Sequence, residues 1–559
     1  MLRLPGHLIA LIVLACPLAL ADKISTLDYI ESIAPPQMMT GVGNSHLQIT
    51  TDVPEAQVFF DQGVSLLHDF WWFESYRSFL QASTLDPNSP MPHWGLYMAG
   101  SDMPNLSKEQ RGELLGNATA KMAALRDNSS PREHYYLDAV ARLHADEDNE
   151  GDSAYKASLV ALLNEYPDEI EARLLLWLML DTGYDAVGKP KPEQLYGQLL
   201  LEREFEKHGK HQGLLHYWIH SQEPGSHPES ALEAAKRLAK LAPKSGHIVH
   251  MPGHIHYLTG NYGKAHEQFV KSEQADADYM KANNIDAIFV WNYLHNFSFM
   301  MSNLAEAGRF LDGEQYADIL GNLTEQSPYR HLEHFEMLLG RAIMEQAYMA
   351  MRLENFELAA ELIRDKRWDG WEKSAGLKAL MAAYEAYSNG MVAALAGDRS
   401  VAESYSRTMD SILWRAQRDK ASLGYRSTPL KIAALELQGL VAAIGGDDEE
   451  AIELLTRAVE KEREIEYGEP RSNIHPAAET LGNVQTRLGN YEAAREAFRS
   501  VLKQRPNAGL PLFGIAYSYE QSGDLQQARK AYKTFLKAWV DADDLLPQKK
   551  HSREWLSNN

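Results

Sequence analysis

The chain has 559 residues, of which 45% are hydrophobic and 24% charged, and its formal net charge is −22. These proportions are typical of a soluble globular protein and argue against wholesale disorder and against a polytopic membrane protein. The acidic excess argues against sequence-independent binding of nucleic acid, because such a chain repels the phosphate backbone. The single cysteine, Cys16, excludes an intrachain disulfide framework and a thiolate metal cluster.

Residues 1–21 have the features of a secretory signal peptide. Arg3 supplies a positive start, residues 8–20 form an apolar run, and Ala19-Leu20-Ala21 offer small residues for cleavage before Asp22. Val13-Leu14-Ala15-Cys16 also resembles a bacterial lipobox, which would instead leave a lipid anchor on Cys16. Both alternatives predict an exported protein, either periplasmic or secreted, or a lipoprotein. No later segment is expected to cross a membrane.

The two ends of the remaining chain differ from its middle. Residues 22–50 are predicted to form an extended lead-in, which contains Pro35-Pro36 and Gly41-Val42-Gly43, and residues 547–559 are predicted to be a polar tail. Between them, apolar residues recur at three- and four-residue spacing, for example in residues 153–180 and 230–243. This pattern predicts helices throughout the middle of the chain.

Glycines and alanines recur at fixed distances within the helical part. Gly489 and Ala494 are followed 34 residues later by Gly523 and Ala528. Around these residues lie Gly482, Phe498, Pro506, Tyr519 and Tyr532. The same template fits further stretches, through Gly63, Ser75, Phe79, Ala82 and Pro87; Gly253, Gly260, Ala265 and Phe269; Gly390, Gly397 and Ala402; and Gly439, Gly446, Ala451, Leu455 and Ala458.

This spacing resembles the tetratricopeptide repeat (TPR). In that repeat a small residue lets helix A approach helix B, a glycine closes the turn, and an alanine and an aromatic residue fill the interface. The resemblance implies an all-α fold, a TPR-like α-solenoid of stacked antiparallel helix pairs with a concave face. One continuous solenoid then replaces the three or four domains expected at about 150 residues per domain. Within it we expect an N-terminal TPR-like helical region at 51–200, a histidine-rich TPR-like region at 201–340 and a C-terminal TPR array at 341–546.

Histidine is concentrated in the middle region, where 11 of the 21 histidines lie within the 88 residues from His208 to His295. His216 and His220 are one turn apart if residues 213–222 form a helix, and Glu223 then follows on the same face. Two imidazoles one turn apart can converge on a metal ion, and a carboxylate on the next turn can ligate or orient them. This stripe is the first part of a predicted site.

A second stripe comprises His247, His250 and His254. Pro252 is not expected deep inside a helix, and it fits the first turn of a helix that begins near Met251. His295 is expected to be a third contributor, because helices about 30 to 45 residues apart stack as neighbours in a solenoid. The remaining histidines of this region are expected to point to another face or to lie at the surface: His256, and His208, His211, His227 and His266.

The strings "HYWIH" and "GHIVHMPGHIH" are similar to motifs of a bacterial group of TPR proteins, in which "HYYIH" precedes "GH-x-x-HMP-x-HIY". The resemblance extends to His295-Asn296 and implies a shared site at these histidines, without a settled reaction. That group often has "FNH" where this chain has Phe70-Trp71-Trp72, which leaves no histidine at that position here.

The predicted ligands are imidazoles and a carboxylate, a set that suits a divalent transition metal such as Zn, Cu or Fe. They are His216, His220, Glu223, His247, His250, His254 and His295. Two alternatives remain open: a groove that binds a peptide or polar ligand through neutral histidines, and a chance cluster of buried histidines with no site.

Two functions are compatible with this pattern. The first is an exported TPR scaffold that binds a protein or peptide partner and carries a metal site in its middle repeats. The alternative is a metalloenzyme, hydrolytic or oxidative, whose cleft is walled by the solenoid and in which Glu223 is a ligand or a general base. The sequence contains no phosphate-binding glycine loop, no HExxH string and no G-x-S-x-G elbow.

Overall fold

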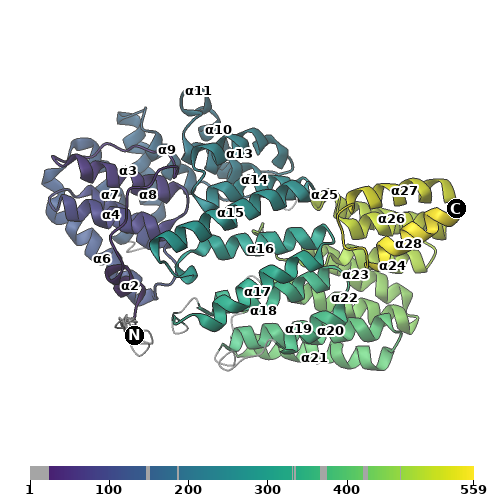
Figure 1. The fold of residues 1–559 in the computed structure, drawn as a ribbon. Helices are drawn as coiled ribbons and strands as arrows, with labels where there is room; N and C mark the ends of the chain where they lie inside the picture. The colour runs from purple at the N-terminus through teal and green to yellow at the C-terminus, as the bar shows by residue number, and fades with distance from the viewer. Residues whose placement is uncertain are drawn as a thin grey trace, which may run out of the picture.

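The computed structural model describes residues 24–145, 151–185, 188–329, 332, 335–365, 374–419, 423, 426–465 and 467–559. The predicted signal peptide and Cys16 lie outside these residues. The described part of the chain contains no β-strand, only an isolated bridge between Tyr184 and Pro190. Its helices are joined by short connections and stack in antiparallel pairs along a curved path (Figure 1), which confirms the predicted α-solenoid.

The helices of the N-terminal region are α2 (Thr26–Ser32), α3 (Pro54–His68), α4 (Trp72–Leu85), α5 (Met91–Asp102), α6 (Lys108–Leu125), α7 (Pro131–Ala145), α8 (Gly151–Glu165), α9 (Ile170–Leu178), α10 (Pro192–Glu202) and α11 (Phe205–His208). The histidine-rich region contains α12 (Gln212–Gln222), α13 (Leu232–Leu241), α14 (Gly246–Leu258), α15 (Tyr262–Asn283), α16 (Trp291–Glu306) and α17 (Phe310–Gln326). Short 3-10 helices cover Arg126–Asn128, Pro228–Ala231 and Ala287–Phe289.

The C-terminal region consists of further helix pairs and a last single helix. They are α18 (Phe335–Arg352), α19 (Phe356–Asp365), α20 (Ala375–Leu395), α21 (Arg399–Arg418), α22 (Ser427–Gly445), α23 (Asp448–Glu462), α24 (Ala477–Arg487), α25 (Tyr491–Gln504), α26 (Gly509–Gln521), α27 (Leu525–Ala538) and α28 (Pro547–Asn558).

One local geometry repeats along the solenoid. A residue with positive φ closes the turn between two paired helices, for example Gly260 (φ 72°) between α14 and α15 and Gly489 (φ 78°) between α24 and α25. Seven residues before Gly489, a Cβ on Gly482 would lie 2.6 Å from the ring of Phe498, so only glycine allows this approach. Because glycine adopts the left-handed conformation without steric cost, the spacing of such glycines marked these pairs in the sequence.

The pairs α16–α17 and α18–α19 are among those that escaped the glycine template. Gly308 (φ 71°) closes the turn between α16 and α17, and Glu354 (φ 61°) closes the turn between α18 and α19. In both pairs the position seven residues earlier holds a larger residue than glycine, Met301 or Ala347. The same turn geometry therefore recurs in these two pairs, although the spacing of the turn residues is not constant.

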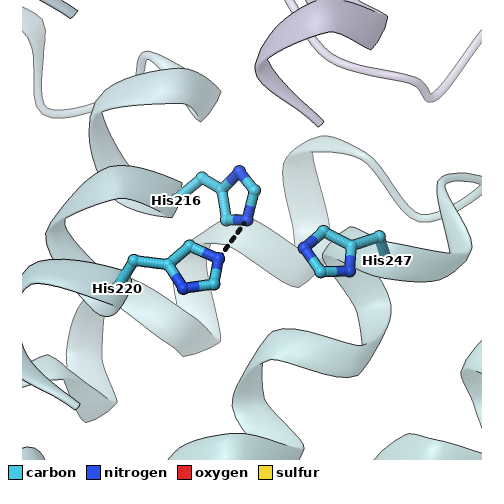
Figure 2. A group of neighbouring side chains, drawn as sticks. All are labelled: His216, His220 and His247. Carbon is cyan, nitrogen blue, oxygen red and sulfur yellow. Dashed lines mark hydrogen bonds between the residues drawn. The ribbon is translucent and has the colours of Figure 1, made fainter. Parts of the chain in front are cut away.

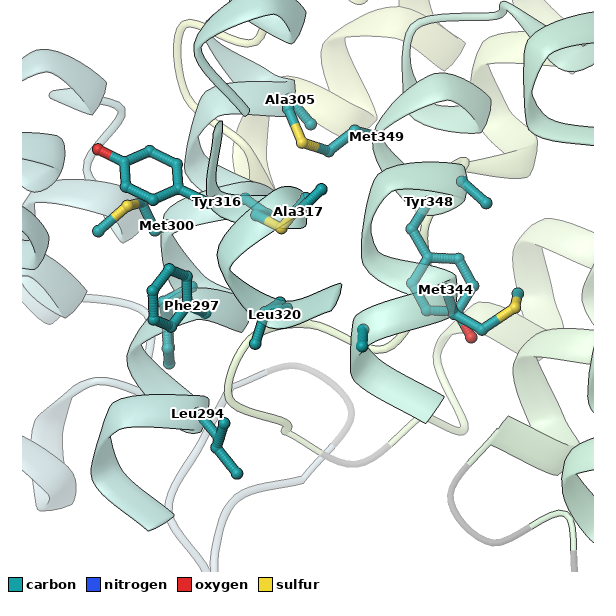
Figure 3. Close-up of a cluster of buried hydrophobic side chains, with 14 of the residues drawn as sticks. Leu294, Phe297, Met300, Ala305, Tyr316, Ala317, Leu320, Met344, Tyr348 and Met349 are labelled. Carbon is teal, nitrogen blue, oxygen red and sulfur yellow. The ribbon is translucent and has the colours of Figure 1, made fainter. Parts of the chain in front are cut away.

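Interleaved apolar side chains hold neighbouring pairs together. In the α16–α18 segment drawn in Figure 3, Phe297 and Met300 of α16 and Leu320 of α17 are almost completely buried, as is Met344 of α18. Burial of apolar surface stabilises such contacts by roughly 25 cal/mol per Å². Each pair thus buries part of its apolar face against the pairs that precede and follow it in the chain.

The C-terminal repeats return to the middle of the solenoid. The hydroxyl group of Tyr262 donates a hydrogen bond to the carbonyl oxygen of Pro506 at 2.8 Å. The indole Nε1 of Trp539 donates to the carbonyl oxygen of Glu306 at 2.9 Å. The backbone N–H of Asp543 donates to the carbonyl oxygen of Gly308 at 2.9 Å. The curvature of the solenoid therefore brings its C-terminal pairs against the turns of the α14–α17 segment.

Both chain ends contain more helix than the sequence analysis expected. The predicted lead-in includes α2, which begins with a reciprocal capping box between Ser25 and Asp28. The predicted polar tail forms α28, in which Lys549 and Ser552 are buried. Lys549 donates a hydrogen bond to the carbonyl oxygen of Ala542, and this helix covers the exposed side of the last repeat, where a solenoid needs a polar cap.

One described helix, α22, is long and apolar enough to match a membrane span by length and composition. The sequence analysis expected no segment after the signal peptide to cross a membrane, and a single match of this kind does not contradict that expectation, because buried core helices have the same length and composition. Here, 61% of the matching window is buried inside the protein. Leu430 and Leu437 of α22 are completely buried in the solenoid core. Its apolar composition is accounted for by packing against its neighbours.

Candidate metal centre

The two predicted histidine stripes face each other across the interior of the solenoid. His216 and His220 lie one turn apart on α12, and His247 approaches them from α14 (Figure 2). One ring nitrogen from each of the three lies within 4.8 Å of the others. All the predicted site residues are at least largely buried, and His250 and His254 are completely so.

The cluster extends from this group of three toward α16. His247, His250 and His295 form a second group with ring nitrogens within 4.8 Å, and His254, His295 and Glu469 form a third. Because His247 and His295 each belong to two groups, the imidazoles make one contiguous set. The structure thus brings together every histidine that the sequence analysis assigned to the site.

Helix α14 begins earlier than predicted. It starts at Gly246 and contains Pro252, whereas we expected a helix that starts near Met251. A proline at this depth removes one backbone hydrogen bond, at a cost of about 3 kcal/mol or more. Here the helix is buried along nearly its whole length, so its packing offsets that cost. The earlier start places all three histidines of the second stripe on one helix.

The Nδ1 atoms of two histidines are held by neutral acceptors. Nδ1 of His216 donates to the carbonyl oxygen of His68 at 2.6 Å, and Nδ1 of His250 donates to Oδ1 of Asn296 at 2.8 Å. The amide of Asn296 cannot be reversed, because its Nδ2 donates to the carbonyl oxygen of Phe269. Both imidazoles therefore carry a proton on Nδ1 and present a lone pair at Nε2.

Glu223 orients two further histidines of the stripes through its carboxylate. Its Oε1 accepts from Nδ1 of His220 at 2.7 Å, and its Oε2 accepts from Nδ1 of His254 at 2.7 Å. Glu223 directly follows α12, so its carboxylate links the first stripe to the second. Hydrogen bonds of this kind fix the tautomer and orientation of histidines that bind metals.

The Nε2 atoms consequently face one another in pairs. Nε2 of His216 lies 3.1 Å from Nε2 of His220, and Nε2 of His250 lies 2.5 Å from Nε2 of His254. Two lone pairs at such distances repel each other, and only a proton or a metal cation between them removes the repulsion. The arrangement therefore creates two positions that favour positive charge.

Burial keeps most of these imidazoles neutral. It lowers the pKa of His216, His247 and His250 well below the ordinary value, and it lowers that of His254 to about 3. The exception is His220, for which burial alone would lower the pKa, but the carboxylates of Glu223 and Glu469 raise it well above the ordinary value. Neutral imidazole is the form that binds metals, and the carboxylates supply a negative field beside it.

His247 is a buried histidine whose two ring nitrogens have no hydrogen-bond partner among the described residues. Its exposed fraction is only 2%. Buried polar atoms are almost always satisfied, and an unsatisfied one needs an explanation such as a bound ion. The position of His247 between the two groups of histidines makes it the central residue of the candidate site.

Sequence reasoning missed Glu469. This carboxylate lies between α23 and α24, where its Oε1 is 3.4 Å from Nδ1 of His220 and its Oε2 is 3.9 Å from Nε2 of His295. Burial and the charge of Glu223 raise its pKa. No local sequence pattern marks Glu469, because it lies in an irregular connection far along the chain from the histidines. It reaches them only because the chain folds back toward the middle repeats.

Phe70 was also missed as a site residue. The repeat template could have revealed it, because Phe70 replaces the glycine expected seven residues after Gly63. It occupies the left-handed turn position (φ 56°) that glycine holds in most other pairs. Its ring centroid lies 4.8 Å from that of His216, 5.5 Å from His220 and 5.8 Å from His247. An aromatic residue in this backbone conformation costs about 1–3 kcal/mol, which marks the position as one constrained by the neighbouring site.

His211 was wrongly predicted to be a surface residue. It is the N-cap of α12 and lies 3.0 Å from Glu171, which also binds the buried His68. Burial alone would raise the pKa of Glu171, but His211 and His68 lower it below the ordinary value. Of the other histidines set aside, His227 is exposed, whereas His208, His256 and His266 are partly buried.

Comparison with known proteins identifies the C-terminal repeats. Residues 480–544 match the family model of the tetratricopeptide repeat. No curated protein matches the sequence. The crystal structure of yeast Tom70 aligns over 90% of this chain and 95% of that chain, with 12% identity and a TM-score of 0.31. The helix pairs from α24 to α27 thus belong to the tetratricopeptide repeat family.

Proposed function

We propose that this chain is an exported TPR scaffold that binds a protein or peptide partner and holds a divalent transition metal in its histidine cluster. TPR arrays present a curved face to their partners, which supports the scaffold part of the proposal. The metal part is supported by the convergence of His216, His220 and His247, whose ring nitrogens lie within 4.8 Å of one another, while neither ring nitrogen of His247 has a hydrogen-bond partner among the described residues. That arrangement is the observation on which the proposal depends.

His216, His220 and His247 would hold one metal ion, and His250, His254, His295 and Glu469 lie where they could complete or extend the site. Glu223 uses both carboxylate oxygens to orient His220 and His254. This favours an orienting role for Glu223 over that of a general base. Imidazole and carboxylate ligands suit Zn, Cu or Fe.

Metal analysis of untagged protein tests the site. We expect near-stoichiometric metal in the natural protein and a large loss in the double variant His216→Ala and His247→Ala, because it removes two ligands of the first group. The matched control is His227→Ala, which replaces an exposed histidine of the same region. Equal metal content in all three proteins, or no metal in any of them after supplementation with Zn, Cu or Fe, would contradict the proposal.

A metalloenzyme is the second candidate, favoured by one specific observation. A cavity of about 510 Å³ adjoins the cluster and shares Glu469 with it. A metal bound beside such a cavity would act as a Lewis acid or activate water. Turnover of ester, peptide, phosphate or phenolic substrates by metal-loaded protein, lost in the double variant, would favour the enzyme over the scaffold.

Export is proposed from the first 21 residues of the sequence. Expression in a bacterial host followed by cell fractionation tests it, with the mature N-terminus as the readout. A start at Asp22 would indicate cleavage of a signal peptide, and a lipid-modified Cys16 would indicate a lipoprotein. Retention of the unprocessed chain in the cytoplasm would contradict both.

A further inference from the structure

The 510 Å³ cavity lies between α16, α18 and residues 467–476. Its volume falls within the range of pockets that take small organic molecules, about 300–1,000 Å³. Tyr257, Tyr348 and Tyr467 supply aromatic walls. Its polar lining includes Ser302 and several charged side chains. Mostly apolar walls with a few placed polar groups are typical of a ligand site.

The charged side chains around this cavity are paired, with one exception. Glu306 accepts from both Arg352 and Arg505, and Arg352 also binds Glu479. Glu469 faces the histidine cluster. Each of these charges therefore has a partner inside the protein.

Three further side chains of the lining are engaged as well. Glu464 pairs with Lys461 at 2.8 Å. Glu345 accepts a hydrogen bond from the hydroxyl group of Ser298 at 2.7 Å. Arg426 donates to the carbonyl oxygen of Ser472 at 2.7 Å and lies 4.5 Å over the ring of Tyr348.

Arg471 is the exception. No hydrogen bond or ion pair joins its guanidinium group to the described residues, although the side chain is partly buried and lines the cavity. A charge removed from water without a partner destabilises the folded protein. Side chains that bind a ligand commonly lower the stability of the folded protein in this way.

We propose that this cavity binds a carboxylate-bearing small molecule, with the carboxylate paired to Arg471 and the remainder of the molecule against the tyrosine walls. A guanidinium group matches a carboxylate with two parallel hydrogen bonds, which makes this pairing strong and directional. The shared Glu469 places the ligand beside the histidine cluster. The proposal does not require a metal ion, so it remains testable if the metal site fails.

Calorimetric titration with pairs of probes tests the site. Each acid is compared with its neutral amide: 3-phenylpropionate with 3-phenylpropanamide, and hexanoate with hexanamide. We expect at least one acid to bind more tightly than its amide by about tenfold or more, because a hydrogen-bonded charge pair is lost in the amide. Binding should persist after treatment with a chelator. If no acid binds more tightly than its amide, the proposal is wrong.

Substitutions identify the residue responsible. Arg471→Gln should weaken acid binding by about tenfold or more, whereas the control Arg463→Gln, at an exposed arginine after α23, should leave it unchanged. Arg471→Lys should retain part of the affinity. Acid binding in Arg471→Gln equal to that of the natural protein would overturn the assignment.

Thermal stability provides a readout that does not involve a ligand. Without added acid, Arg471→Gln should melt at the same temperature as the natural protein or higher, because the substitution removes an unpaired charge. The added acid should raise the melting temperature of the natural protein and not that of the variant. A marked loss of stability in Arg471→Gln would show that the side chain serves the fold, and the proposal would then be wrong.

Discussion

At the scale of single residues, the candidate site depends on side chains whose surroundings are unusual for their type. Phe70 adopts a left-handed conformation where most other repeats have glycine, and its carbonyl oxygen accepts a hydrogen bond from Nε1 of Trp291 at 2.6 Å. His247 is buried with unsatisfied ring nitrogens. Both features are unfavourable for folding alone. A site at the histidines, with the turn at Phe70 packed over it, would account for both features.

Two substitutions at Phe70 separate the backbone strain from the loss of the ring. Phe70→Gly and Phe70→Ala both remove the ring, but only glycine adopts φ 56° without steric cost. We expect Phe70→Gly to be more stable than Phe70→Ala by about 1 kcal/mol, although both are less stable than the natural protein. Melting temperatures measured side by side test this. A more stable alanine variant would show that the turn is not strained.

At the scale of helices, buried polar networks connect elements that apolar packing alone would leave free to slide. His475 lies just before α24, and its Nδ1 is 2.8 Å from Oε1 of Glu436 on α22. Its Nε2 faces Glu354 at 3.8 Å and Glu479 at 3.9 Å. Burial alone would lower the pKa of His475, but Glu436 and the other carboxylates raise it to about 10. The protonated imidazole thus links α22, α24 and the turn after α18.

This network makes stability depend on alkaline pH. A histidine with a folded pKa of about 10 and an unfolded pKa near 6.5 stabilises the fold fully below pH 6.5. That contribution is lost as the pH rises toward 10. We expect the melting temperature to fall between pH 7 and about 10, and the fall to be shallower in His475→Gln. The control His227→Gln should retain the natural slope. Identical slopes in all three proteins would contradict the role of His475.

At the scale of the whole molecule, the curvature of the solenoid creates both candidate sites. The C-terminal repeats contact the turns of the middle repeats, and the connection from 467 to 476 lies inside the curve. Arg352 of α18 joins this arrangement by binding Glu306 of α16 and Glu479 of α24, with nitrogen to oxygen distances of 2.9–3.0 Å. These side chains are almost completely buried.

Removal of this arginine should loosen the curve. Arg352→Met leaves two buried carboxylates without their shared partner, so we expect a loss of about 3–5 kcal/mol in stability and faster proteolysis near residues 467–476. The matched control is Arg399→Met, which breaks surface ion pairs with Glu403 and Asp447 and should cost far less stability. Thermal melting and limited proteolysis measure both effects. Equal losses in the two variants would show that the network does not hold the curve.

The sequence determined the helix pairs and the histidine stripes, because both depend on local spacing. Gly482 with Phe498, and His216 with His220, are related through a single helix pair or a single helical turn. The pair closed by Glu354 escaped the template because another residue occupies the glycine position. The start of α14 was also misplaced, because the packing of the whole helix outweighs the local effect of Pro252.

Only the tertiary structure decided what completes the sites. Glu469 reaches the histidines, and Arg471 lines the neighbouring cavity, because the chain returns across the curve of the solenoid. The direction of that return is set by small rotations accumulated over many helix pairs. The total of these rotations cannot be read from any local pattern in the sequence. Local spacing in the sequence therefore determined the repeating unit and the histidine stripes, and the superhelix decided which distant residues meet them.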